Sequence, residues 1–129
     1  MRIQFKFAAL ALVVLLAACN TQPINNVEQT AMVNAAGKPL SRDQVRGAIV
    51  RAGGALGWQM ADEGTGKLVG TINLRKHTAV VDIPYSASGY SIKYRSSAGL
   101  DEANGQIHKN YNGWIQNLHR GINAQLSAS

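Results

Sequence analysis

Three histidines, His77, His108 and His119, offer the most direct test for chemistry in this sequence, since imidazole binds metal ions and exchanges protons near neutral pH. A zinc site needs three or four converging ligands. His108 and His119 lie on one predicted helix, separated by about 16 Å at a rise of 1.5 Å per residue. One ion cannot bridge that distance, so we predict no metal site and no cofactor. His77 is interpreted as a partly buried residue with a backbone partner.

Hydrolytic chemistry has equally little support in the sequence. The serine pattern Gly-x-Ser-x-Gly, which marks one large class of hydrolases, does not occur. The adjacent acids Asp62 and Glu63 fall in a predicted strand, where neighbours point to opposite faces, and Asp101, next to Glu102, is expected to cap a helix. Neither pair forms an acid and base couple. We therefore predict a protein that is not an enzyme, and an enzyme or enzyme inhibitor is the alternative.

The single cysteine ends a segment with the pattern of a leader peptide. Arg2 and Lys6 precede an apolar run over residues 7–18. A run of about a dozen residues is too short to span a bilayer, which needs roughly 20, and is typical of a secretory signal peptide. The run closes on Leu16-Ala17-Ala18-Cys19, which resembles the lipobox of bacterial lipoproteins. We predict a signal peptide over residues 1–18.

The lipobox resemblance implies that Cys19 carries a diacylglycerol and becomes the first mature residue. Acyl chains hold a protein at a membrane more firmly than a basic patch does. Asn20 follows the cysteine, and aspartate is the residue that favours retention in the inner membrane in this class. The resemblance therefore implies an outer-membrane lipoprotein facing the periplasm, with exposure at the cell surface left open. The alternative activity becomes that of a periplasmic enzyme or inhibitor.

Charge does not identify a partner. Removal of Arg2 and Lys6 with the leader lowers the formal net charge from +6 to +4. Nucleic-acid binding is typically accompanied by a basic stripe interleaved with exposed aromatic residues, but Tyr111 and Trp114 fall on the apolar stripe of a predicted helix. Together with export, this pattern predicts no nucleic-acid partner.

The mature chain divides into a polar segment and a domain. Residues 19–40 are interpreted as the lipidated N-terminus and a flexible tether, because residues 20–40 show no sustained period. Ile24, Val27, Met32 and Val33 leave open an extended segment lying along the domain. Residues 41–129 are long enough for one small periplasmic domain.

Periodicity predicts the elements of that domain. Ser41 and Gln44 form a capping box, and a helix with an apolar stripe follows. From Trp58 to Ser96 the period changes to two, which predicts strands with a tight turn at Arg75-Lys76. Because this turn has neither Gly nor Asn, a bulge or a wider turn there is the alternative. A final long helix is expected after Asp101. The predicted fold is a two-layer α+β domain: helix, four-stranded antiparallel meander and helix, with both helices on one sheet face.

The same alternation predicts a strand register. It sets Ile72 opposite Ala79 and Val81 opposite Tyr94 on the inner face. On the outer face it predicts a cross-strand charge pair between Asp82 and Lys93.

Four strings resemble a family of small, uncharacterised proteobacterial lipoproteins. They are Gly57-Trp58, Arg75-Lys76-His77-Thr78-Ala79, Tyr90-Ser91-Ile92-Lys93-Tyr94 and Ile107-His108-Lys109-Asn110-Tyr111-Asn112-Gly113-Trp114. The resemblance implies an envelope location and carries no activity.

Recognition is the remaining class of function. Two surfaces hold the candidate binding residues, the sheet and the edge of the last helix; the residues are Arg75, His77, Lys93, Arg95, His108, Asn110 and Asn112. An envelope protein, peptidoglycan or lipopolysaccharide is the expected partner, besides the membrane itself. We predict a non-catalytic binding or structural role.

Overall fold

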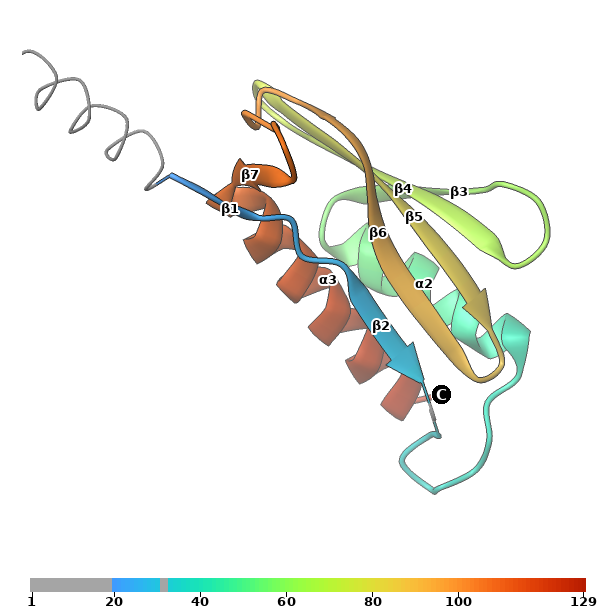
Figure 1. Ribbon diagram of the computed structural model, residues 1–129. Helices are drawn as coiled ribbons and strands as arrows, with labels where there is room; N and C mark the ends of the chain where they lie inside the picture. The colour runs from blue at the N-terminus through green and yellow to red at the C-terminus, as the bar shows by residue number, and fades with distance from the viewer. Residues whose placement is uncertain (1–19, 31–32) are drawn as a thin grey trace, which may run out of the picture.

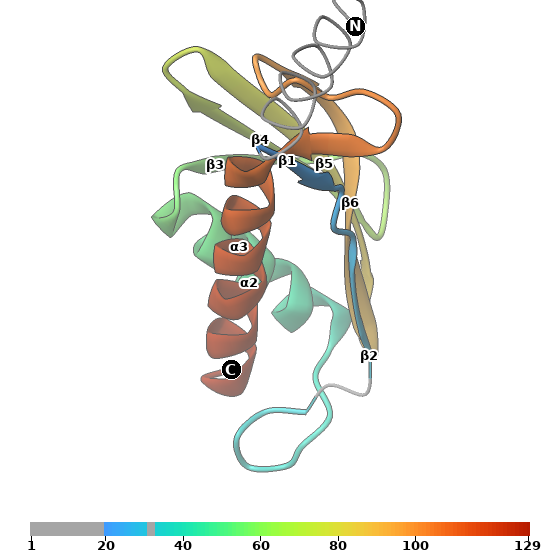
Figure 2. The same ribbon diagram turned by 60° about the vertical axis from the view of Figure 1, so that its left-hand side comes forward.

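The computed structural model describes residues 20–30 and 33–129 (Figures 1 and 2). The predicted signal peptide, Cys19 and Met32 lie outside the described residues. The elements are β1 (Thr21–Pro23), β2 (Val27–Thr30), α2 (Arg42–Ala55), β3 (Trp58–Asp62), β4 (Lys67–Leu74), β5 (His77–Ser86), β6 (Gly89–Ala98), β7 (Gln106–His108) and α3 (Lys109–Ser127).

The described chain is α+β, with a five-stranded antiparallel sheet in the order β2-β6-β5-β4-β3 and a separate pair formed by β1 and β7. The predicted register is confirmed: Ile72 opposes Ala79, and Val81 opposes Tyr94. The sequence predicted a sheet of four strands. The sheet has five, because residues 27–30 add a strand by pairing with β6.

Helix α2 begins as its capping box predicts. The Ser41 side chain accepts a hydrogen bond from the Gln44 amide, and the Gln44 side chain accepts one from the Ser41 amide, at 3.1 and 2.9 Å. These two bonds satisfy amide groups that a helix N-terminus otherwise leaves unpaired. The helix ends before Gly57, whose φ of +90° suits glycine.

The last helix begins later than the sequence predicted. Asp101 has a φ of +55° and does not cap it; α3 starts at Lys109 with His108 as the N-cap. Between them, Asn104 and Gly105 have φ values of +52° and +77° and join Ala103 to Gln106 in a bridge. Two successive left-handed residues, Asn then Gly, favour a tight hairpin turn. This turn competes with the helical pattern and delays the helix.

We name residues 20–30 and 33–36 the N-terminal strap; it contains the extended strands β1 and β2 and the start of a turn at Ala35, and it runs beside α3 (Figure 1). At one end the Asn20 carbonyl accepts a hydrogen bond from the Lys109 amide, at 3.1 Å. At the other end the Ala35 amide donates to the Ser127 carbonyl, at 3.0 Å. Residues 20–30 therefore lie along the domain as the extended segment that Ile24 and Val27 left open.

A glycine permits the strap to approach the sheet. Gly89 pairs with Thr30, and a Cβ built at Gly89 would lie 2.5 Å from the Gln29 carbonyl oxygen. Any larger residue at this position would push β2 off the edge of β6.

One hydrophobic core holds the layers together. Helices α2 and α3 pack against each other, and their buried side chains meet those of β4, β5 and β6. Ile24 and Val27 of the strap pack against this core from its side. The most deeply buried large residues are Tyr111, Ile49, Leu68, Ile83, Ile92, Leu100, Ile107, Ile115, Leu118 and Ile122.

Two buried tyrosines differ in how their hydroxyls are satisfied. The Tyr90 hydroxyl donates to Asn123 Oδ1 at 2.9 Å and lies 3.0 Å from His119 Nδ1. The Tyr111 hydroxyl is buried without a hydrogen-bond partner among the described residues, and its ring meets Tyr94 edge-on. Burial raises the pKa of both phenols above its ordinary value.

We expect the two hydroxyls to contribute to stability with opposite sign. Tyr90→Phe removes a satisfied group and should lower the free energy of unfolding by about 1 kcal/mol, whereas Tyr111→Phe removes an unsatisfied one and should leave it unchanged or raise it by up to about 1 kcal/mol. Urea unfolding followed by circular dichroism measures both. An equal loss in the two variants would contradict the assignment.

Candidate functional site

The N-terminal end of α3 brings together several of the predicted binding residues. The rings of His77 and His108 stack with centroids 6.2 Å apart, and the Trp114 ring lies 6.3 Å from His77. Arg75 is exposed in the β4–β5 turn, two residues before His77, with a φ of +57°. His77 is partly buried, as predicted. Its ring contacts the rings of His108 and Trp114, whereas the sequence predicted a backbone partner.

His108 closes the start of α3. Its Nδ1 accepts a hydrogen bond from the Asn110 amide at 3.1 Å, as an N-cap side chain does. An accepting Nδ1 is unprotonated, so the neutral ring carries its proton on Nε2. The sequence placed His108 inside the helix, whereas the structure gives it this capping role.

Asn112 fastens the strap to α3. Its Nδ2 donates to the Pro23 carbonyl at 2.9 Å and to Gln22 Oε1 at 3.2 Å, while its Oδ1 accepts from the Asn25 amide at 3.0 Å. Both ends of this amide are therefore occupied by the protein itself. The residue positions the strap and the groove beside it.

We expect Asn112→Ala to loosen the strap near residues 22–25. Loss of these bonds should cost about 1–2 kcal/mol of local stability, which corresponds to roughly five- to thirtyfold faster amide exchange at Asn25. Hydrogen exchange measures this rate. The control is Asn110→Ala, because the Asn110 side chain is exposed and only its backbone amide bonds to His108. Equal exchange rates in the two variants would show that Asn112 does not hold the strap.

A groove of about 690 Å³ lies between the strap and the first half of α3. We name it the amide groove, because carboxamide side chains dominate its lining and Lys109 is its one charged lining residue. The lining residues are Gln22, Asn25, Lys109, Asn110, Asn112, Gly113, Trp114, Gln116 and Asn117. Such a lining offers hydrogen-bond donors and acceptors without a strong field, which suits an uncharged polar ligand.

Trp114 also borders a smaller apolar cavity of about 60 Å³ on its other side. Leu56 and Leu74 line that cavity and are 39% and 42% exposed, so they are among the most exposed large apolar residues described. The sequence assigned Trp114 to the core. The structure shows it half-buried, packed against the core and open to both cavities.

Two of the basic side chains on the sheet, Arg95 and Lys67, are paired with carboxylates. Arg95 lies 2.8 Å from Glu63 and 3.3 Å from Asp82, and Lys67 lies 3.0 Å from Glu63 and 3.4 Å from Asp82. Hydrogen bonds to the Glu63 carboxylate, first from Arg95 and second from Lys67, hold the pKa of this carboxyl below its usual range. These four residues form a neutral cluster, here named the outer quartet.

Lys93 opposes Asp82 in the register, as predicted, but the Asp82 carboxylate contacts Lys67 and Arg95 instead. Lys93 is exposed on β6. Lys93 and Arg95 therefore lie on the sheet, apart from the residues gathered at the start of α3.

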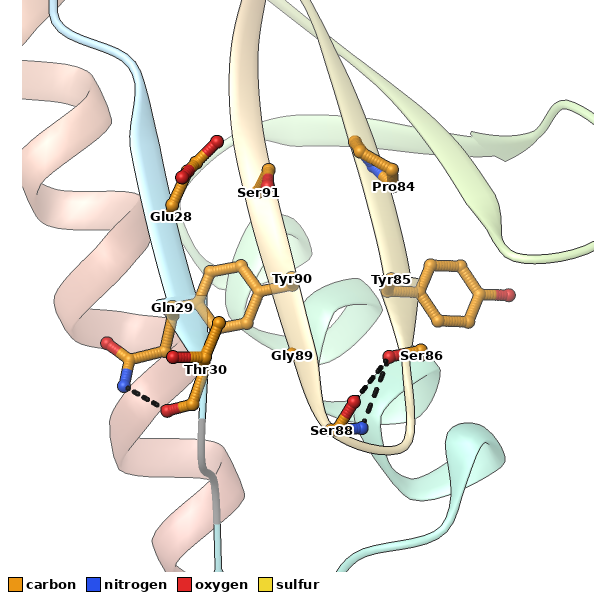
Figure 3. A pocket seen from close by; sticks show the side chains of 10 residues that line it. All are labelled: Glu28, Gln29, Thr30, Pro84, Tyr85, Ser86, Ser88, Gly89, Tyr90 and Ser91. Atoms are coloured by element: carbon orange, nitrogen blue, oxygen red, sulfur yellow. Dashed lines mark hydrogen bonds between the residues drawn. The ribbon is translucent and has the colours of Figure 1, made fainter.

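A third cavity, of about 520 Å³, opens where β2, β6 and β5 end (Figure 3). Figure 3 shows Ser88 turned toward Ser86, and these residues hydrogen-bond within the β5–β6 turn. Glu28 is the one charged residue lining this cavity. No residue predicted from the sequence as a candidate lines it.

The amide groove was only partly predictable. Asn110 and Asn112 stood out in the sequence, and Gln116 and Asn117 follow at helical spacing on α3. Gln22 and Asn25 were missed, because they lie in the segment interpreted as a tether. The exposed amides on the helix could be found in the sequence. The place of the strap beside α3, which makes them one wall of a groove, had no signal in the sequence.

No protein-family model, curated protein or solved structure matches this chain. Over residues 20–30 and 33–129, no three His, Cys, Asp or Glu side chains gather in a group able to hold a metal ion. Within the same described part of the chain, none of the helices has the length and apolar character needed to cross a membrane. The resemblance to small lipoproteins stays a prediction from the sequence strings.

Proposed function

We propose that this protein is a membrane-anchored lipoprotein of the bacterial cell envelope, acylated at Cys19, whose domain binds a ligand without catalysis. The leader pattern supports the anchor: basic residues, an apolar run over 7–18, two small residues and then the cysteine. The outer membrane, on its periplasmic side, is the proposed location. In this proposal both helices shield one face of a meander, and the other face carries the neutral outer quartet.

The observation that carries the binding role is the amide groove. Its walls come from α3 and from the strap, and Asn112 joins the two. A groove built by fastening a distant segment against a helix keeps its shape without a ligand, which lowers the entropic cost of binding.

The lining of the amide groove favours a glycan among the envelope partners considered. Carboxamides pair with hydroxyl and acetamido groups, and the Trp114 ring offers an apolar surface at the groove wall. Lipopolysaccharide phosphates would need several cations, but Lys109 is the one cation in the lining. Peptidoglycan is therefore the proposed ligand class.

The anchor is tested by metabolic labelling with radioactive palmitate. We expect incorporation into the wild-type protein and none into Cys19→Ala, because the thiol is the acylated group. Equal incorporation into both proteins would show that another residue carries the lipid.

The ligand is tested by calorimetric titration with soluble disaccharide-peptide fragments of peptidoglycan. We expect Gln116→Arg to weaken binding at least about tenfold, or 1.4 kcal/mol, because the larger side chain fills the amide groove. Ala124→Arg is the matched control, since Ala124 is exposed on the same helix outside the groove and gains the same charge. No binding by the wild type, or equal weakening in both variants, would contradict the glycan assignment.

A further inference from the structure

The strap holds Asn20, the residue after the proposed lipid attachment point, directly against the fold. Asn20 follows Cys19, and the Asn20 carbonyl already accepts a hydrogen bond from Lys109, the first residue of α3. Thr21 pairs with His108. Neighbouring Cα atoms are about 3.8 Å apart, whereas a free tether of about 20 residues would allow an end-to-end distance of about 25 Å.

This connection is fastened at several points beyond Asn20. The Ile24 amide donates to the Gly105 carbonyl at 2.9 Å, and Asn112 binds the strap at Gln22, Pro23 and Asn25. The Ile24 side chain packs against the core. Because these contacts act together, the strap end stays on α3 unless several bonds break at once.

The end of the domain beside Asn20 is made by the start of α3 and the β4–β5 turn. Stacking of the His77 ring on the His108 ring brings these two segments together. The His108 amide also donates to the carbonyl of Leu100, just after β6. Figure 2 shows β1 beside the first turn of α3. We name this surface the anchor end; its members are Leu74, Arg75, Lys76, His77, Asp101, Glu102, His108, Lys109 and Asn110.

The side chains of the anchor end suit a headgroup layer. Arg75, Lys76 and Lys109 present cations to lipid phosphates, and Leu74 is 42% exposed beside them. Asp101 and Glu102 offset two of the three charges, so this surface does not bind a membrane by itself. Acyl chains supply the binding, and the anchor end is the surface that they bring to the bilayer.

We propose that, in the protein acylated at Cys19, the anchor end lies against the phospholipid headgroups and the β5–β6 turn points away from the membrane. This inference rests on the proposed acylation and adds an orientation to it. Strand β5 separates the two ends by about 30 Å, since its ten residues make nine steps of about 3.3 Å each. The amide groove then opens sideways, close to the membrane surface.

The orientation is tested by fluorescence quenching in vesicles of phosphatidylethanolamine and phosphatidylglycerol that contain a nitroxide-headgroup lipid. Acylation consumes the Cys19 thiol, so an added cysteine is the single site for a fluorescent label. Asn110→Cys places the label at the anchor end, and Ala87→Cys places it in the exposed β5–β6 turn. We expect several-fold stronger quenching at position 110 than at position 87.

Vesicle flotation separates failure of the anchor from failure of the orientation. Protein that floats with the vesicles but is quenched equally at both positions would overturn the orientation and leave the anchor intact. Protein that does not float would overturn both.

A linker variant tests the cause of the orientation. Twenty Gly and Ser residues inserted between Cys19 and Asn20 should retain flotation and bring the two quenching values together. An unchanged difference would show that the short connection does not set the orientation.

Discussion

Backbone pairing of the N-terminal strap with β6 and β7 is the constraint on which the rest of this structure depends. Strand β1 pairs with β7, and β2 pairs with β6. The second pairing satisfies backbone groups along the first part of β6, from Gly89 to Ile92, and makes β2 the edge strand of the sheet. The first one creates a wall of the amide groove and fixes where Asn20 lies. Fold, groove and proposed membrane orientation therefore share one set of hydrogen bonds.

The distribution of charge separates the two surfaces that the sequence proposed for binding. On the sheet, the outer quartet places each cation beside two carboxylates, so Arg95 is occupied by Glu63 and Asp82. At the start of α3, carboxamides dominate and Lys109 is the charged member of the groove lining. The basic balance of the chain thus says little about its ligand, because hydrogen-bonding geometry rather than net charge distinguishes the groove.

Local patterns were enough to predict what local physics determines. The Ser41 capping box and the alternation that sets Ile72 opposite Ala79 depend on neighbours in sequence, and both are observed. The start of α3 was missed because Asn104-Gly105 turns the chain inside a segment of helical period. The strap was missed because its polar residues have no period of their own; they are ordered by distant partners. The same reason hid the amide groove, whose two walls are far apart in the chain.

The strap also sets an order of events during folding. Asn25 and its partner Asn112 are 87 residues apart in the chain, and Thr21 and its partner His108 have the same separation. Strand β2 can dock as soon as β6 has formed, whereas β1 needs β7, which follows later in the chain. Contacts of such long sequence separation slow folding, because the chain between them must be ordered first. Strand β1 is thus among the last elements to be fixed, and the amide groove forms only when β1 has joined β7 and the start of α3.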